Sequence, residues 1–226
     1  MNIVFVTGID TGVGKTVVTG LWARRLLGQG RRVLTAKLVQ TGAAPGEVAE
    51  DIRTHRRLMG LPLLPCDEQG WTCPYVFRFP ASPHLAGRLE NRSVEPGVLD
   101  RSWQRLADQC DWLLLEGAGG LEVPLRGDLT ILDYVADRGF PVLVVTGPRL
   151  GSLNHTLLTV YALQTRGLRV LGLAYNLALA AEPEITADTR AFFRQRWPGL
   201  PLWDVPACDP ALPEAVDLRQ VPDWLP

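Results

Sequence analysis

Apolar runs recur along the chain, separated by longer stretches in which apolar and polar residues mix at helical spacing. The clearest runs are 3–7 (IVFVT), 33–39, 112–116, 142–146 and 170–176, with a weaker one at 201–206. Runs that are apolar throughout, without alternation, are typical of strands covered on both faces. Each run is therefore predicted to be one strand of a parallel sheet.

Helical stretches fill most of the intervals, and predicted helices cover 13–27, 47–59, 83–90, 96–109, 129–138, 152–166 and 183–196. Strands that alternate with helices, joined by right-handed crossovers, predict a doubly wound α/β fold with helices on both faces of a mostly parallel sheet. We expect a single domain over 1–226, because this length can bury one full core. The proline-rich stretch 60–82 predicts an ordered excursion, and the tail from Pro206 is also proline-rich.

Charge and composition narrow the classes of partner. The formal net charge is −1 and no long run of one sign occurs, which argues against a nucleic-acid or membrane-surface partner. The apolar runs are too short to span a membrane, and the N-terminus lacks a basic leader, so we expect a cytoplasmic protein. The four cysteines show no zinc-site spacing and are expected to be reduced thiols.

Lysine is nearly absent from the chain. Of 23 basic residues only two, Lys15 and Lys37, are lysines. A codon bias towards arginine explains the depletion, but it does not explain why lysine remains at these two places. An ammonium is a compact charge that fits a tight phosphate loop, whereas a guanidinium is broad and planar. The two lysines are therefore candidates for phosphate-facing roles.

The segment GIDTGVGKT at 8–16 predicts a phosphate-binding loop between the first strand and the first helix. The common pattern is G-x-x-x-x-G-K-[ST], which here would require glycine at position 9, where Ile9 stands. Backbone N–H groups and the helix dipole would face the anion. Lys15 would reach the β- and γ-phosphates and the Thr16 hydroxyl would bind Mg²⁺. An ordinary glycine turn is the alternative.

Two more candidates end predicted strands, where ligands bind in sheets of this kind. Lys37 either extends to solvent or faces the phosphates as a second cation, and we favour the second interpretation. Glu116 ends the third strand and either holds Mg²⁺ or caps a turn. The glycines that follow it, at 117, 119 and 120, permit close approach of backbone to a ligand.

Weaker candidates have common structural roles as alternatives. Asp51 could hold a metal, but Glu47 and Glu50 beside it are equal candidates and most such acids are solvated. Ser152 and Asn154 can cap a helix, or the exposed N–H groups there can bind an anionic substrate group. Asn176, at the end of the fifth strand, could read a nucleobase edge or stabilise a turn.

Taken together, these motifs resemble one known family, the dethiobiotin synthetases. GIDTGVGKT resembles the family loop G-x-D-T-x-V-G-K-T, which has the same one-residue-longer spacing. LVQTG after Lys37, FPASPH at 79–84, LLLEGAGG, LGSLNH at 150–155 and Asn176 match further family motifs in order. The resemblance covers roughly residues 1 to 180.

The resemblance implies a cytoplasmic homodimer with a P-loop NTPase fold that acts in biotin synthesis on diaminopelargonate, CO₂ and ATP, with Mg²⁺. One substrate amine would become a carbamate, ATP would phosphorylate it, and the second amine would close the cyclic urea and release phosphate. Carbamate phosphorylation develops negative charge on oxygens, which cations and loop N–H groups stabilise without any side-chain nucleophile.

The family positions carry over residue by residue. The implied catalytic residues are Lys37 and Lys15, and the implied metal ligands are Thr16, Asp51 and Glu116. The implied ATP-binding residues are Gly12, Val13, Gly14, Lys15, Thr16, Val17, Asp51, Glu116, Gly117, Ala118, Gly119, Asn176 and Pro206. The implied substrate-binding residues are Thr11, Lys37, Thr41, Gly151, Ser152, Leu153 and Asn154, the last four acting across the dimer interface. Two departures are Gly12, a glutamate in some members, and Leu38, usually a proline.

Other classes remain as alternatives. A partition- or septum-type ATPase switch carries a signature lysine five residues before the loop lysine, and here that position is Asp10. An ATP-dependent amidating enzyme of cobalamin synthesis usually adds a glutamine amidotransferase domain, for which the chain has no room. A nucleotide-binding module without catalysis would leave Lys37 unexplained.

Overall fold

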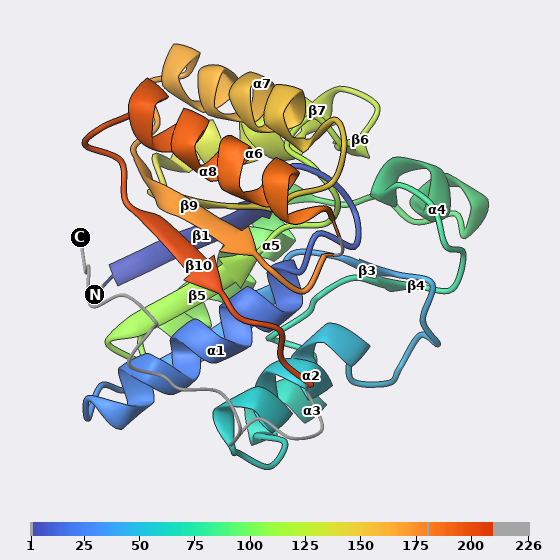
Figure 1. The fold of residues 1–226 in the computed structure, drawn as a ribbon. Coiled ribbons are helices and arrows are strands. Elements are labelled where there is room, and N and C mark those ends of the chain that lie inside the picture. Colours follow the sequence, from blue (N-terminus) through green and yellow to red (C-terminus); the bar gives the residue numbers. More distant parts are fainter. Residues whose placement is uncertain (1, 180, 210–226) are drawn as a thin grey trace.

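A six-stranded sheet forms the centre of the molecule, with strand order β10-β9-β8-β1-β5-β2 and every neighbouring pair parallel (Figure 1). The structure is a computed structural model and describes residues 2–179 and 181–209. The strands are β1 (Asn2–Gly8), β2 (Val33–Lys37), β5 (Trp112–Glu116), β8 (Val142–Thr146), β9 (Val170–Asn176) and β10 (Leu202–Val205). All six predicted strands are present, and the doubly wound parallel architecture is confirmed.

Helices cover both faces of this sheet because alternate strand residues point to opposite sides. Val4 and Val6 belong to the core under α1 (Lys15–Gly28) and the end of α2 (Glu50–Met59). Phe5 belongs to the larger core under α5 (Pro96–Ala107), α6 (Ile131–Arg138), α7 (Ser152–Thr165) and α8 (Pro183–Arg196). Among the described residues, none of the helices combines the length and apolar composition needed to cross a membrane.

Several predicted boundaries were wrong by a few residues, each for a local reason. The first helix begins at Lys15 instead of Val13, because Gly14 has φ +104° and so cannot be part of a right-handed helix. The second begins at Glu50 instead of Glu47, after the extended Ala49. The helix predicted from 129 begins at Ile131, because the Thr130 hydroxyl caps it by accepting from the Asp133 N–H.

The strand order reverses around β1, which lies between β5 and β8. Loops that follow strands on either side of such a reversal leave a crevice at the carboxyl edge of the sheet. The phosphate-loop segment follows β1, Lys37 ends β2 and Glu116 ends β5, so their register brings all three to that edge. The single-domain assignment over 1–226 stays a prediction, since the tail from 210 lies outside the described residues.

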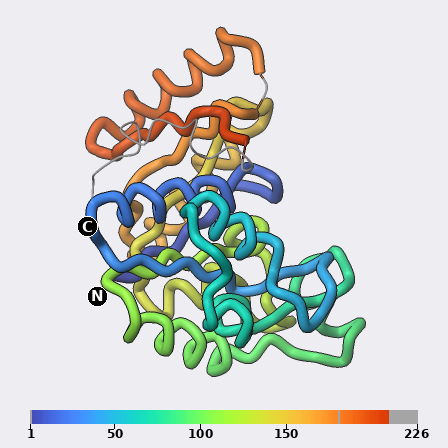
Figure 2. Tube along the Cα trace, turned by 90° about the horizontal axis from the view of Figure 1, so that it is seen from below, coloured from blue at the N-terminus to red at the C-terminus, as the bar shows by residue number. Residues whose placement is uncertain are grey.

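Apart from α2, most of the segment between β2 and α5 lies outside the central sheet, at one end of the molecule (Figure 2). It contains β3 (Gln40–Thr41), which pairs in parallel with β4 (Val76–Phe77), the short helix α3 (Pro65–Glu68) and α4 (Pro83–Leu89). The sequence predicted an ordered excursion at 60–82 but neither of the short strands nor α3. A second small pairing, β6 (Pro124–Arg126) with β7 (Leu129–Thr130), was likewise not predicted.

One buried carboxylate organises the excursion. Asp67, 2% exposed, accepts hydrogen bonds from Nε and Nη2 of Arg56, each at 2.8 Å. It also accepts from the Leu64 N–H and the Thr72 hydroxyl, both at 2.8 Å. The network reaches the carboxyl edge of the sheet, because the Thr72 carbonyl accepts the Lys37 N–H at 2.7 Å. Asp67 therefore fixes the segment that backs Lys37.

Replacing Asp67 by alanine is expected to destabilise the protein by roughly 3–5 kcal/mol, because Arg56 would remain buried without its partner. Urea denaturation followed by circular dichroism measures the change. Asp108→Ala, which removes an exposed carboxylate at the end of α5, is the matched control and should change the free energy of unfolding by less than about 0.5 kcal/mol. Equal effects of the two substitutions would contradict the assignment.

Candidate functional site

A cleft of about 700 Å³ opens at the carboxyl edge of the sheet, beyond β1, β2 and β5. Its walls come from the phosphate-loop segment, the ends of β2 and β5, the first turn of α2 and the turn before α4. Its lining combines the polar groups of Lys15, Lys37 and Glu116 with the apolar side chains of Val39 and Val123 and the stretch 80–83. The cleft is thus the place where the chemistry-bearing residues predicted after successive strands converge.

The loop from Gly8 to Thr16 has the backbone geometry of an anion cradle. Gly12 and Gly14 have φ of +70° and +104°, conformations that side chains rarely adopt. A Cβ on Gly14 would also lie 2.3 Å from the Asn176 Nδ2, so glycine is required there on two grounds. Lys15 is 6% exposed, and its ammonium donates to the Asp10 carbonyl at 2.9 Å, so the side chain folds back over the loop.

The second lysine is buried in the same cleft and does not extend to solvent. Its Nζ lies 2.5 Å from Asp51 Oδ2 and 2.7 Å from Glu116 Oε1. Burial would lower the pKa of Lys37, but the charges of Glu116 and Asp51 outweigh it and raise the pKa above its ordinary value. Burial, together with the charge of Lys37, lowers the pKa of Lys15 to about 8. The pKa values of the two ammonium groups are therefore shifted in opposite directions within one cleft.

Glu116 is the shared acceptor of the site and is fully buried. Oε1 accepts from Lys37 Nζ at 2.7 Å and from the Thr16 hydroxyl at 3.0 Å, and Oε2 lies 2.8 Å from His55 Nε2. Burial would raise the pKa of this carboxyl, but the Lys37 charge and the His55 hydrogen bond lower it to about 2. The carboxylate is thus ionised at neutral pH.

The donor set fits a hard divalent cation. The Asp51 and Glu116 carboxylates lie against Lys37 Nζ, and the Thr16 hydroxyl donates to the same Glu116 oxygen. The described residues hold no group of three or more His, Cys, Asp or Glu that would cage a metal by itself. Mg²⁺ typically uses one or two carboxylates and completes its shell with phosphates and water. The set therefore suits a metal that arrives with a nucleotide.

Most of the residues predicted for the site line the cleft. They are Thr11, Gly12, Gly14, Lys15, Thr16, Val17, Lys37, Thr41, Asp51, Glu116, Ala118 and Gly119. Val13 and Gly117 do not, because Val13 packs in the core beneath α1 and a Cβ on Gly117 would lie 2.8 Å from the Phe5 ring. These two residues pack against the core beneath the loops and do not face the cleft.

Asn176 and Pro206 lie apart from the cleft lining, at the ends of β9 and β10. Asn176 pairs in register with Val205, so the two predicted adenine contacts are neighbours. The Asn176 amide donates to the Val13 carbonyl at 2.9 Å, and its oxygen accepts the Ala178 N–H at 3.0 Å. This side chain therefore supports the phosphate loop, and its adenine contact stays a prediction.

The four residues Gly151, Ser152, Leu153 and Asn154 also lie away from the cleft, at the beginning of α7. Ser152 is buried, whereas Gly151 and Asn154 are exposed. Within one copy of the chain they do not meet Lys37. Their predicted contact with substrate stays a prediction that requires a second copy.

Sequence reasoning missed one residue at the centre of the site, His55. The signal was present, because His55 follows Asp51 by four residues on a predicted helix and so shares its face. It was overlooked because the three histidines do not cluster with the cysteines in sequence, so no metal-site spacing pointed to it. Gln40 and the stretch 80–83 also line the cleft without having been singled out as ligands.

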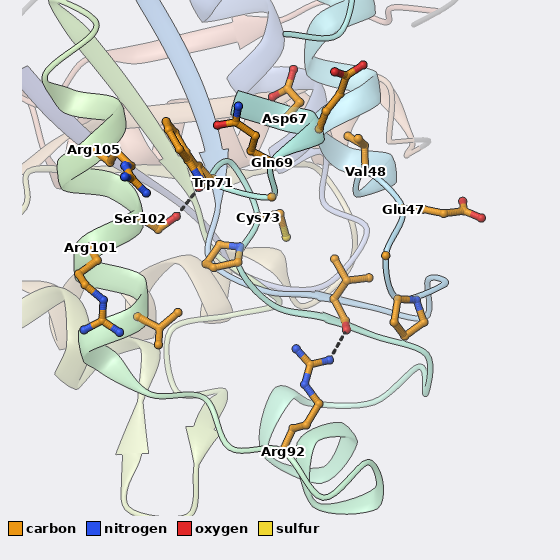
Figure 3. Close-up of a pocket in the computed structure, with 17 residues that line it drawn as sticks. Glu47, Val48, Asp67, Gln69, Trp71, Cys73, Arg92, Arg101, Ser102 and Arg105 are labelled. Carbon is orange, nitrogen blue, oxygen red and sulfur yellow. Dashed lines mark hydrogen bonds between the residues drawn. The ribbon is translucent and has the colours of Figure 1, made fainter. Parts of the chain in front are cut away.

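A second cleft, of about 540 Å³, lies between α5 and the segments 45–48 and 67–76 (Figure 3). Its polar groups mostly hold the excursion in place. The Ser102 hydroxyl donates to the Trp71 carbonyl, Arg92 donates to the Val76 carbonyl at 3.0 Å, and Arg105 stacks 4.1 Å from the Trp71 ring. This cleft lacks the oxygen and lysine set found beyond β2 and β5.

Comparison with known proteins identifies the family. A family model described as an AAA domain matches residues 2–198. The ATP-dependent dethiobiotin synthetase BioD 2 of Haemophilus influenzae is 47% identical over 77% of this chain and 91% of its own length. The ATP-dependent dethiobiotin synthetase BioD of Chlorobaculum tepidum is 49% identical over 84% of this chain and 78% of its own length.

Solved structures agree on the fold at lower identity. The septum site-determining protein MinD of Pyrococcus horikoshii, solved with Mg-ADP, is 20% identical with a TM-score of 0.55, over 99% of this chain and 90% of that one. The cell-division ATPase MinD of Pyrococcus furiosus is 22% identical with a TM-score of 0.53, over 94% and 86%. Identity this low shows a P-loop NTPase architecture alone, whereas the sequence matches are far closer. The sequence matches, at 47% and 49% identity over most of each chain, show that this chain belongs to the family of ATP-dependent dethiobiotin synthetases.

Proposed function

We propose that the protein is a ligase that uses ATP and Mg²⁺ to close a cyclic urea on diaminopelargonate with CO₂, giving dethiobiotin, ADP and phosphate. The observation that carries the proposal is the pairing of Lys37 with Asp51 and Glu116 beside the phosphate loop. A second buried cation next to a nucleotide site would stabilise the negative charge of a transferred phosphoryl group and of a second anion that reacts with it. The membership in the dethiobiotin synthetase family supports the substrate.

The proposed reaction has three balanced steps. One amine of the substrate attacks CO₂ and loses a proton, which leaves a carbamate. A carbamate oxygen then attacks the γ-phosphorus of ATP and ADP leaves, which gives a carbamic-phosphoric anhydride. The second amine attacks the carbamate carbon, loses a proton and expels phosphate, which closes the ring. No residue of the protein forms a covalent bond in these steps, so positioning and charge stabilisation supply the catalysis.

The roles of the residues follow from their positions. Backbone N–H groups of the loop and Lys15 would bind the ATP phosphates, and Lys37 would neutralise the carbamate and the transferred phosphoryl oxygens. Thr16, Asp51 and Glu116 would hold Mg²⁺, which supplies charge stabilisation on the phosphate oxygens when bound. Thr11 and Thr41, which both line the cleft, would contact the substrate.

A homodimer and a cytoplasmic location are further parts of the proposal. Asn154, Leu158 and Tyr161 recur at intervals of three or four and lie on one side of α7, and Leu150 lies in the turn just before the helix. Leu150 is 96% exposed and Leu158 is 59% exposed, which is unusual for large apolar side chains. A partner covering this side of α7 would account for their exposure, and the proposal requires that the same partner place the beginning of α7 at the cleft of the other copy.

A switch ATPase of the MinD kind is the second candidate, because proteins of that kind share the fold. Asp10 argues against it, since the signature lysine of such switches falls at this position. The Asp10 carbonyl instead accepts the hydrogen bond from Lys15 of the same loop.

Incubation of the protein with ATP, Mg²⁺, bicarbonate and diaminopelargonate is expected to release phosphate only when both bicarbonate and diaminopelargonate are present. The product should be heavier than the substrate by one carbonyl less two hydrogens by mass spectrometry. Lys37→Ala should lower kcat by roughly 10²–10³, as for loss of one stabilising charge. Arg31→Ala removes an exposed charge before β2 and should leave kcat unchanged. ATP hydrolysis indifferent to diaminopelargonate would favour the switch ATPase.

Affinity for ATP is expected to fall as pH rises above about 8, the pKa of Lys15 in the free protein. Phosphate favours the protonated ammonium and raises its pKa, so binding above pH 8 takes up a proton and weakens by at most about tenfold per pH unit. The last ionisation of the phosphate, with a pKa of about 6, is complete in this range and does not contribute to the change. Calorimetry in two buffers of different ionisation enthalpy measures the proton uptake. Affinity that stays constant between roughly pH 7 and pH 9, about one unit on either side of the transition, would contradict it.

Leu158→Arg is expected to convert the dimer to a monomer, because it places a charge in the centre of the apolar side of α7. Sedimentation velocity measures the mass, and turnover should fall with it if the beginning of α7 contributes to the partner's site. Gln104→Arg, an exposed position on α5, is the control and should keep the mass of the dimer. A wild-type protein that sediments as a monomer at assay concentration would contradict the proposed homodimer.

A further inference from the structure

His55 is a fully buried histidine that lies beneath the site and for which the proposed reaction has no role. It lies on α2, one turn after Asp51, so one helix contributes both residues. Asp51 points into the cleft towards Lys37, whereas His55 reaches Glu116 from the protein interior. In the part of the chain that the structure describes, Glu116 is the one residue with which the His55 ring makes a polar contact.

The contact has a defined direction. A carboxylate can only accept, so at 2.8 Å the Nε2 of His55 carries the proton and donates to Glu116 Oε2. The other ring nitrogen, Nδ1, is buried and has no hydrogen-bond partner among the described residues. Burial of an unpaired ring nitrogen costs free energy. The histidine is therefore held for its Nε2–H, since an apolar side chain would fill the same space without that cost.

The two oxygens of Glu116 are divided between the cleft and the interior. Oε1 takes both cleft-side donors, Lys37 and the Thr16 hydroxyl, while Oε2 takes His55 alone. Without the His55 donor, Oε2 would be a buried anionic oxygen with no partner. The carboxylate would then rotate to share both oxygens with the Lys37 ammonium, the remaining charge beside it. Such a rotation removes Oε1 from its place next to Thr16.

We propose that His55 is a positioning residue that fixes the Glu116 carboxylate so that Oε1 faces Thr16 and a divalent cation bound with the nucleotide. The inference rests on the proposed function only as far as metal-nucleotide binding in this cleft, and not on the ring closure. His55 does not touch nucleotide or substrate. It acts through Glu116, as outer partners of metal ligands do, and their loss typically weakens metal affinity by about 10–100-fold.

Two substitutions separate the hydrogen bond from the packing. His55→Leu fills much of the volume but removes the donor. His55→Gln keeps a donor at about the distance of Nε2 from the backbone. Met59→Leu, one turn further along α2, is the matched control, because it exchanges similar volumes in the same buried helix without a contact to Glu116.

Binding of Mn²⁺ in the presence of ADP, measured as loss of the free-ion EPR signal, tests the proposal without any turnover. His55→Leu should weaken Mn²⁺ binding by about 10–100-fold. His55→Gln should recover most of it, and Met59→Leu should bind as the wild type does. Binding of ADP with EDTA present should be unchanged in all variants, because His55 lies away from the phosphate loop.

Three results would overturn the proposal. They are Mn²⁺ affinity that is unchanged in His55→Leu, equal weakening in His55→Leu and His55→Gln, and an equal loss of metal-free ADP binding. If the His55→Leu protein does not fold, His55→Gln is compared with Met59→Leu. Weak Mn²⁺ binding by the glutamine variant alone would then contradict a role for the donor. Absence of dethiobiotin formation by the wild type would instead refute the proposed ring closure and leave this test intact.

Discussion

The ion pair between Lys37 and Glu116 is the interaction on which the rest of the site depends. The two residues end neighbouring parallel strands at the same register position, so the sheet itself brings them together. Each would be costly to bury alone. Lys37 is tolerated because Glu116 and Asp51 lie within hydrogen-bond distance of its ammonium, and Glu116 is tolerated because Lys37, Thr16 and His55 surround its carboxylate. The pair holds a cation beside the phosphate loop before any nucleotide binds.

The surrounding structure serves this pair from several directions. The excursion between β2 and α5 fixes the backbone of Lys37 through the Thr72 carbonyl, and the buried Asp67 fixes that segment in turn. Thr16 brings the first turn of α1 to Glu116, and α2 supplies Asp51 and His55. A site of this kind requires rigid support, because catalysis by charge stabilisation needs groups that do not reorganise during the reaction.

The sequence predicted the sheet, its helices and most of the cleft, because apolar strands and residues at strand ends follow directly from the physics of a parallel sheet. Lys15, Lys37 and Glu116 were found for that reason. His55 was missed because its importance lies in a contact 61 residues away in sequence, with Glu116. The short strands β3 and β4 were missed because pairs of two residues carry no periodicity. The beginning of α1 was misplaced because the conformation of Gly14 depends on the loop around it.

The scarcity of lysine has a chemical consequence. Every ε-amine of the protein lies in one cleft, and both are buried, with exposed fractions of 6% for Lys15 and 5% for Lys37. Amine-directed acylating reagents therefore have no surface lysine on which to react, and besides the α-amino group they meet only the site itself. Lys15, whose pKa is about 8, is the more nucleophilic of the two near neutral pH. Amine-directed covalent labels should therefore react selectively at Lys15, and a bound nucleotide would shield that residue.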